Sequence, residues 1–300
     1  MDQIGADRAR DGRSLSVGII GLGVVGGAMY RGLRSLGRDV RGYDSDPARS
    51  PDSLEQTLEQ EVSFLTLPTP VSADGQCDLS AIRCILEKAS TLRTSSLLVL
   101  RSTVPVGTTE HFEKKFPSLN LGFSPELLRS ATADADFLHP SLTIYGGKHP
   151  DQFFLALKDV CGTSETQRVM SVGEAEMAKL FLNGYATLKA VFASEMAELA
   201  TRMKLDWSQV ISAVEIDARV GSGYLAAIGP DGMPGVGGHC LPKDTRMLVE
   251  QLGPGSLLAN ALHQNAKLRA ATGSTARLAY VRSARSPRQH KSGLSQFDSH

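Results

Sequence analysis

The sequence feature that most constrains the fold is a glycine-rich turn, Gly21-Leu22-Gly23-Val24-Val25-Gly26, which directly follows a short apolar run at residues 16–20. A helical pattern of apolar residues continues from the turn to Leu36. Strand, GxGxxG turn and helix in immediate succession are typical of a dinucleotide-binding unit. Gly21 permits the tight turn, Gly23 lets the backbone approach a pyrophosphate, and Gly26 lets helix and strand pack closely. We therefore expect a Rossmann-type domain.

The residues around this turn predict how a cofactor is held. Val24 and Val25 begin the expected helix, whose N-terminal N–H groups and dipole attract phosphates. A second strand, residues 39–43, ends at Asp44, about twenty residues past the glycines, where an acid binds the adenosine ribose 2′-OH and repels a 2′-phosphate. This position favours NAD over NADP. The alternative is that Asp44 is only a turn residue.

Strands and helices continue to alternate through the first half, as in an α/β fold with a doubly wound parallel sheet. In such a sheet, ligands bind beyond the carboxyl ends of the strands. Thr69, Thr103 and Glu126 each follow one of the expected strands, so we expect them to line one cleft. The further strands are predicted at 62–67, 97–100, 121–123 and 142–145, with a helix at 78–89.

The second half has a helical pattern and predicts an all-α domain built on one long helix, residues 174–204. Lys179 and Asn183 are four positions apart, so both project from one face of that helix. Together they can donate hydrogen bonds to one oxygen and stabilise charge that builds on it. The alternative is an ordinary solvated face. Shorter helices are predicted at 207–214, 244–252 and 255–271.

A glycine-rich loop near position 240 holds the candidate nucleophile. Cys240 follows Gly237 and Gly238 and precedes Lys243 and a helix expected to begin at Asp244. A neighbouring cation and a helix N-terminus both favour the reactive thiolate. The alternative is a buried structural cysteine.

The other three cysteines, at positions 77, 84 and 161, are scattered without a CxxC pair. This spacing predicts neither a metal site nor a disulfide framework, and it favours the reducing cytoplasm.

Composition sets the remaining limits. Three hundred residues suit two domains, and 32 Lys and Arg balance 32 Asp and Glu. The formal net charge is therefore zero, and it does not favour nucleic acid or a membrane surface as a partner. We expect a Rossmann domain at residues 15–170 and a helical domain at 171–272, with disordered tails at 1–14 and 273–300.

Seven motifs in one order resemble the nucleotide-sugar dehydrogenase family, which includes UDP-glucose, GDP-mannose and UDP-N-acetylhexosamine 6-dehydrogenases. The resemblance covers roughly residues 15–270. The motifs are GLGVVG at 21–26, LPTP at 67–70, STVPVG at 102–107, SPE at 124–126, GEAEMAKLFLN at 173–183, DARVG at 217–221 and GGHCLPKD at 237–244.

The resemblance implies oxidation of a primary alcohol to a carboxylate with two NAD, through a thiohemiacetal and a thioester on Cys240. It implies that Lys179 and Asn183 stabilise the oxyanion, and that Glu126 and Asp244 position the water and transfer protons. Thr103 is expected to place the water or the nicotinamide. The expected substrate contacts are Glu126, Lys179, Asn183, Arg219, Gly237 and Lys243, with Arg219 reaching the substrate across a homodimer formed through the long helix.

The sequence departs from the family in three places. Family members continue into a third domain that grips the nucleotide, whereas this sequence stops after the connecting helix. Three explanations are open: a smaller substrate, a separate chain that supplies the domain, or an inactive product. Residues 129–131 read Arg-Ser-Ala where the family has Arg-Glu-Gly. His239 and Lys243-Asp244 are typical of different branches, so the sugar is not assigned.

Two other functions fit the same motifs. A β-hydroxyacid or 6-phosphogluconate-type dehydrogenase shares the GxGxxG turn and a lysine with an asparagine four residues on, but it needs no cysteine and reduces one NAD. A non-catalytic NAD-binding subunit that works through a partner would bind NAD without turnover.

Overall fold

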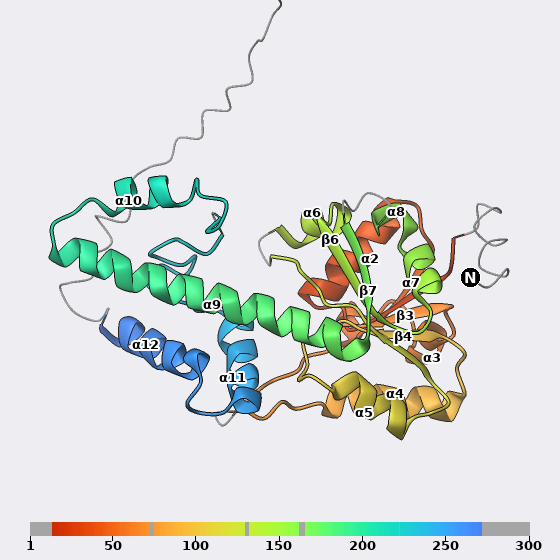
Figure 1. Ribbon diagram of the computed structural model, residues 1–300. Helices are drawn as coiled ribbons and strands as arrows, with labels where there is room; N and C mark the ends of the chain where they lie inside the picture. Colours follow the sequence, from red (N-terminus) through yellow and green to blue (C-terminus); the bar gives the residue numbers. More distant parts are fainter. Residues whose placement is uncertain (1–13, 73–74, 130–131, 162–165, 222, 272–300) are drawn as a thin grey trace, which may run out of the picture. The chain divides into compact units, whose positions relative to one another are not determined.

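The computed structural model describes residues 14–72, 75–129, 132–161, 166–221 and 223–271 (Figure 1). The expected tails at 1–14 and 273–300 lie outside these ranges, apart from Ser14. The chain divides into two compact units. Unit 1 comprises Met1–Gly184 and Lys243–Pro254, and unit 2 comprises Tyr185–Pro242 and Gly255–His300.

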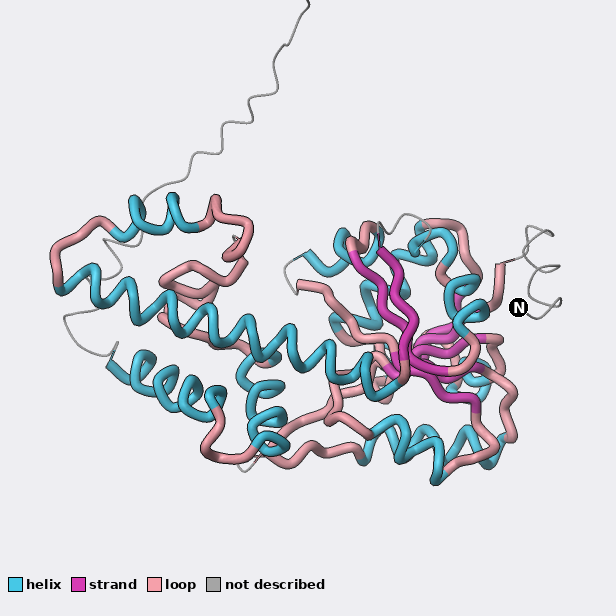
Figure 2. The backbone as a smooth tube through the Cα atoms, viewed as in Figure 1, coloured by secondary structure: helices cyan, strands magenta, loops and turns pink. Residues whose placement is uncertain are grey.

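Unit 1 is built on a seven-stranded sheet of order β2-β1-β3-β4-β5-β6-β7, drawn as magenta tubes in Figure 2. Strands β1 to β5 are parallel, in the order expected of a doubly wound sheet, so the α/β prediction is confirmed. Their bounds are β1 Val17–Ile20, β2 Val40–Tyr43, β3 Val62–Leu65, β4 Leu97–Leu100, β5 Asn120–Phe123, β6 Leu142–Gly147 and β7 Thr166–Met170.

The last two strands correct the expectation of an all-parallel sheet. β6 runs antiparallel to β5, and β7 runs parallel to β6. The connection between β5 and β6, residues 124–141, includes the six-residue helix α6 (Ala133–Leu138). β7 was not predicted, because its sequence TQRVM stays largely exposed at the sheet edge and carries no apolar run.

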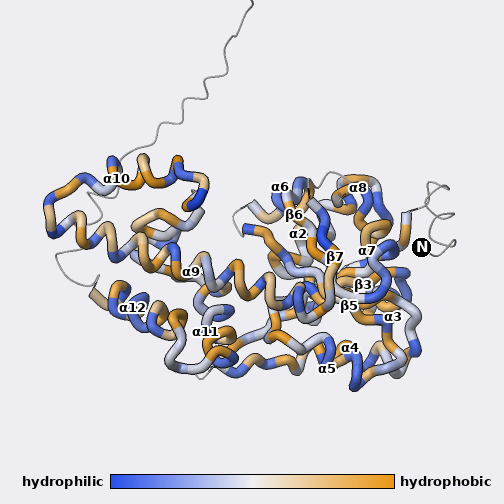
Figure 3. Tube along the Cα trace, viewed as in Figure 1, coloured by the Kyte–Doolittle hydropathy of each residue, from blue (hydrophilic) through white to orange (hydrophobic). Residues whose placement is uncertain are grey.

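Two hydrophobic clusters cover the two faces of this sheet. Alternate residues of one strand point to opposite faces, so Phe64 of β3 belongs to one cluster and Leu65 to the other. The first cluster packs under α2 (Val24–Ser35), α6 and α7 (Pro150–Ala156). The second packs under α3 (Leu54–Leu58), α4 (Ser80–Leu92) and α5 (Thr108–Lys115). Figure 3 shows hydrophobic residues along the strands and polar residues on the outer turns.

Most predicted helices are present with small shifts at their ends. The long helix α9 spans Val172–Arg202, and α10 spans Trp207–Val214 as predicted. α12 spans Leu257–Ala271. The short helices α3, α5, α7 and α8 (Lys158–Cys161) were not predicted.

Helix α11 spans Cys240–Leu252, so the start predicted at Asp244 is wrong. The sequence-based prediction began the helix after Pro242. A proline within the first turn is tolerated, because its missing N–H has no partner in the helix.

The boundary between the two compact units differs from the domain boundary expected from the sequence. Ala175 and Leu180 in the first turns of α9 are fully buried, and Ala175 belongs to the second cluster of unit 1. Unit 1 therefore continues into α9 as far as Gly184. The division into domains at residue 170 stays a prediction.

Unit 2 has a thin core, in which Ala193, Ala197 and Ala200 of α9 pack near Trp207 and Leu225. In the described part of the chain, no helix has the length and apolar character required to cross a bilayer.

Candidate functional site

The glycine turn after β1 has the geometry that a bound pyrophosphate requires. Gly21 has a φ of +93°, which favours glycine. A Cβ at Gly26 would overlap the carbonyl oxygen of Gly21 and the hydroxyl of Thr66, whereas a Cβ at Gly23 would meet no described atom within 4 Å. Gly26 therefore allows close packing, and Gly23 leaves space for a ligand.

The same turn opens on a cavity of about 740 Å³ that Leu22, Gly23 and Val24 line together with α6. No described side chain caps the N-terminus of α2, and its first turn holds no acidic residue. Val24 is 59% exposed. Unsatisfied N–H groups and the helix dipole make such an end an anion site, so these residues fit a dinucleotide.

Asp44 fixes the end of β2 beside this turn. Its Oδ2 accepts a hydrogen bond from the N–H of Leu22 at 2.7 Å, and its Oδ1 accepts one from Asp46 at 2.9 Å. Burial opposes ionisation of the carboxyl, but these hydrogen bonds and nearby Arg49 hold its pKa below the ordinary value. Asp44 thus shapes the turn, while its contact with a ribose stays a prediction.

Lys179 and Glu126 form a buried ion pair. The Lys179 Nζ donates to the Glu126 carbonyl oxygen at 2.7 Å and lies 3.1 Å from its Oε1. Lys179 is only 4% exposed, which contradicts the alternative of a solvated helix face. The pair joins α9 to the segment that follows β5.

A second chain of contacts joins five predicted site residues. Asn183 Nδ2 donates to Asp244 Oδ2 at 2.6 Å, and Lys243 Nζ lies 2.7 Å from Asp244 Oδ1. Lys243 also donates to the Thr69 hydroxyl at 3.3 Å, and that hydroxyl donates to the carbonyl of Thr103 at 2.9 Å. Lys179 and Asn183 therefore contact two different carboxylates. Unit 1 brings together Thr69, Thr103, Asn183, Lys243 and Asp244.

Unit 2 holds the remaining candidates. Cys240 is exposed, so the alternative of a buried structural cysteine is contradicted. It is the first residue of α11, where the helix dipole favours a thiolate. Arg219 has an 89% exposed side chain and pairs with Asp217. Among the other thiols, burial raises the pKa of Cys77 to about 11, which makes it a poor nucleophile at neutral pH.

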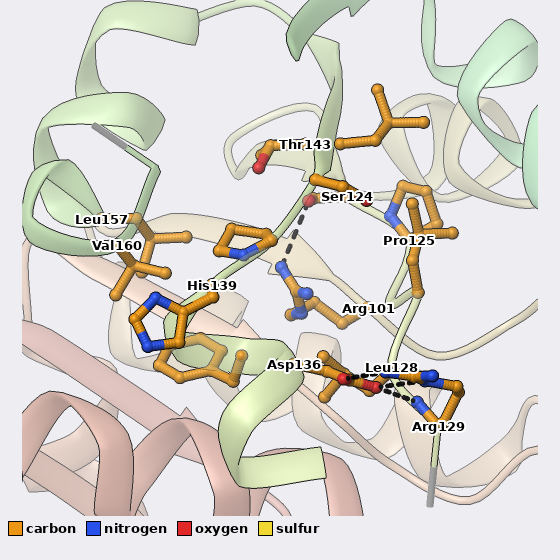
Figure 4. Close-up of a pocket in the computed structure, with 15 residues that line it drawn as sticks. Arg101, Ser124, Pro125, Leu128, Arg129, Asp136, His139, Thr143, Leu157 and Val160 are labelled. Atoms are coloured by element: carbon orange, nitrogen blue, oxygen red, sulfur yellow. Dashed lines mark hydrogen bonds and ion pairs between the residues drawn. The ribbon is translucent and has the colours of Figure 1, made fainter. Parts of the chain in front are cut away.

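Sequence reasoning missed a cavity of about 350 Å³ beyond the ends of β4 and β5 (Figure 4). Arg101 lines it, is 7% exposed and donates to the Ser124 hydroxyl at 3.2 Å. Arg129 also lines the cavity and forms a bidentate ion pair with Asp136. This pair holds the pKa of the Asp136 carboxyl far below its usual range. A charged residue directly after a buried strand was the available signal for Arg101.

The described residues contain no group of three or more His, Cys, Asp or Glu that could hold a metal ion.

Comparison with known proteins identifies the family. Residues 48–160 match the NAD binding domain of the UDP-glucose/GDP-mannose dehydrogenase family, and residues 173–267 match the central domain of the same family. The chain belongs to the UDP-glucose/GDP-mannose dehydrogenase family. Unit 1 carries the family's NAD binding domain, and NAD is its cofactor.

Relatives of this dehydrogenase family align along most of the chain. The UDP-glucose 6-dehydrogenase of Campylobacter jejuni is 32% identical over 212 residues, which cover 67% of this chain and 52% of the relative. The chain spans about half the length of the curated relatives it matches. A solved UDP-glucose dehydrogenase from Pyrobaculum islandicum is 27% identical and superimposes with a TM-score of 0.75 over 88% of this chain and 69% of that one.

A solved 3-hydroxyisobutyrate dehydrogenase from Mycobacterium tuberculosis shares the fold. It superimposes with a TM-score of 0.67 over 91% of this chain and 98% of that one, at 18% identity. At this identity the likeness concerns the fold alone.

Proposed function

We propose that the chain oxidises a primary alcohol, the C6 hydroxymethyl group of a nucleotide sugar, to a carboxylate with two NAD. The observation that carries the proposal is the pair of contacts Lys179–Glu126 and Asn183–Asp244, which bring together the oxyanion donors and the acid–base groups expected of this family. The relatives named UDP-glucose 6-dehydrogenase support this substrate class.

In this proposal, side chains of the protein form the covalent intermediates and transfer the protons. Bound NAD supplies the hydride acceptor for each of the two oxidations. The Cys240 thiolate adds to the aldehyde carbon, and the carbonyl oxygen takes up the negative charge. Lys179 and Asn183 stabilise that oxygen by donating hydrogen bonds. Loss of hydride from the thiohemiacetal leaves a thioester, which water hydrolyses to release the carboxylate and the thiol.

The acid–base roles follow from the same contacts. Glu126 lies 3.1 Å from the Lys179 ammonium and is the group that takes a proton from water. Asp244 lies between Lys243 and Asn183 and can take the proton of the alcohol. Thr103 lies beside Thr69 and orients the water. Arg219, Gly237 and Lys243 bind the substrate.

The quaternary proposal is a homodimer through α9. Within unit 2 this helix exposes Phe192 at 61%, Met196 at 36% and Leu199 at 37%, and a cavity of about 410 Å³ lies between α9 and α10. An apolar stripe of this kind is typical of an interaction surface. We also propose that a further nucleotide-binding domain, on the same or a separate chain, binds the nucleotide of the substrate. The proposed location is the cytoplasm.

Counting NADH per substrate tests the reaction. We expect two NADH per nucleotide sugar for the natural chain, and loss of the acid product for Cys240→Ser, because serine is a poor nucleophile and leaving group here. Cys84→Ser is the matched control, since Cys84 is exposed on α4 and has no proposed role. One NADH per substrate, with full activity in Cys240→Ser, would instead indicate a two-electron dehydrogenase.

A further inference from the structure

The loop that leads to Cys240 is held by side chains from two helices of unit 2. Asn265 of α12 is 7% exposed, and its amide contacts both backbone groups of one loop residue. Its Oδ1 accepts the Val236 N–H at 2.8 Å, and its Nδ2 donates to the Val236 carbonyl at 3.0 Å. A single side chain thus replaces the backbone partners that a strand would have provided.

The preceding loop residue is held from α9. The Ser194 hydroxyl is fully buried and accepts the Gly235 N–H at 2.8 Å. It also lies 2.9 Å from the carbonyl oxygen of Ala190 and 3.1 Å from that of Ala227. Gly235 and Val236 are therefore fixed by side chains that are distant in the sequence.

An ion pair completes this set of contacts. Arg269 of α12 lies 2.7 Å from Asp231 Oδ2 and donates to the Pro234 carbonyl at 3.3 Å. A Cβ at Gly235 would overlap the amide of Asn265, and a Cβ at Gly237 would overlap Asp231. The loop glycines are therefore required by close packing against these side chains. We call Ser194, Asn265, Arg269 and Asp231 the loop clamp.

We propose that the loop clamp positions Cys240, with Asn265 as its central positioning residue. Only Gly237, Gly238 and His239 separate the clamped Val236 from Cys240. Because each residue spans at most about 3.5 Å, fixing Val236 confines the thiol to a small volume at the start of α11. The side chains of the clamp are positioning residues, since they touch backbone rather than substrate. The inference rests on the proposed role of Cys240 as nucleophile.

Thiol alkylation tests the clamp without any substrate. Iodoacetamide labelling of the full chain, read peptide by peptide by mass spectrometry, compares Cys240 with Cys84, an exposed thiol of unit 1. In the natural chain we expect Cys240 to react at lower pH than Cys84. In Asn265→Ala the rate of Cys240 at pH 7 should fall about tenfold, and its pH midpoint should move toward about 8.5, the value of an ordinary thiol.

The matched control is Asn260→Ala on the same helix, where the exposed amide donates to the Ser256 carbonyl just before α12. We expect this control to leave Cys240 labelling unchanged. Trp207, the single tryptophan of the chain, is 8% exposed and reports by its emission whether unit 2 stays folded.

Natural Cys240 reactivity in a folded Asn265→Ala variant would overturn the proposal. If that variant unfolds, Arg269→Gln takes its place, with a loss of at least about threefold expected from its two lost contacts; an unchanged rate there also overturns the proposal. A chain that labels as expected but reduces no NAD on any nucleotide sugar would refute the proposed reaction and leave the clamp intact.

Discussion

At the scale of single residues, Lys179 places a buried ammonium beside the segment that follows β5. A charge that is 4% exposed is stable only with partners, and here both come from Glu126, through its carbonyl and its carboxylate. Removing either side chain leaves the other charged group buried and unpaired. In the proposed reaction this pair preorganises the Lys179 ammonium, because its position is set before any substrate arrives.

Lys179→Met should lower kcat by about 10²–10³, since one donor to the developing oxyanion is lost. We expect the Kd for NAD to change little, because Lys179 contacts the segment after β5, whereas the glycine turn follows β1 and two strands lie between them in the sheet. Steady-state NADH kinetics and a fluorescence titration with NADH separate the two effects. Lys88→Met, which removes an exposed ion pair with Glu55, is the control. Equal kcat in both variants would argue against the proposed role of Lys179.

At the scale of elements, one buried carboxylate joins two helices next to the candidate site. Glu176 of α9 is fully buried and accepts the N–H groups of Gly107 at 2.6 Å and Thr109 at 2.8 Å, at the N-terminus of α5. It also accepts the Thr109 hydroxyl at 2.6 Å. The loop that carries Thr103 is thereby tied to the helix that carries Lys179. A helix N-terminus is a favourable place for this charge.

Glu176 should leave a pH signature in the stability of unit 1. Burial raises the pKa of its carboxyl above the ordinary value of 4.5, against the opposing effect of the hydrogen bonds from Thr109 and Gly107. Because the folded pKa is the higher one, this contribution to stability is complete below pH 4.5 and is lost as the pH rises through the folded pKa.

Urea unfolding from pH 4 to 8 measures this effect. We expect the natural chain to lose stability with rising pH relative to Glu176→Gln, which does not titrate. The glutamine should also cost about 1–3 kcal/mol throughout, because its NH₂ group faces an N–H donor. Glu174→Gln, at the exposed start of α9, is the control. Parallel pH profiles for natural chain and Glu176→Gln would contradict the assignment.

At the scale of the whole molecule, α9 contributes to the cores of both units and still exposes an apolar stripe. In unit 2 its buried positions are mainly alanines, while Phe192, Met196 and Leu199 are exposed. A stripe of large exposed side chains beside a small core is typical of a surface that a partner covers.

Phe192→Glu should shift the chain from dimer to monomer, because a charge would replace an apolar anchor at the interface. Sedimentation velocity over a range of protein concentrations measures the mass in solution. Glu198→Gln, on an exposed turn of the same helix, should leave the mass unchanged. A natural chain that is monomeric at every concentration would remove the dimer from the proposal.

The sequence alone determined the fold class, the glycine turn and the candidate chemistry. A glycine with positive φ, an apolar run or a helical period acts over a few neighbouring residues, so Gly21, β4 and α10 could be read directly. The types of the site residues were visible for the same reason. The order of the motifs along the chain then indicated the family.

Tertiary structure alone decided the strand directions at the far edge and the partners of the site residues. β6 runs antiparallel to β5, and no local pattern in the sequence records that direction. Lys179 meets Glu126 across 53 positions, Asn183 meets Asp244 across 61, and Asn265 meets Val236 across 29. Such contacts depend on how whole elements pack. A sequence predicts that Lys179 and Asn183 share a face, but only the fold assigns each its own carboxylate.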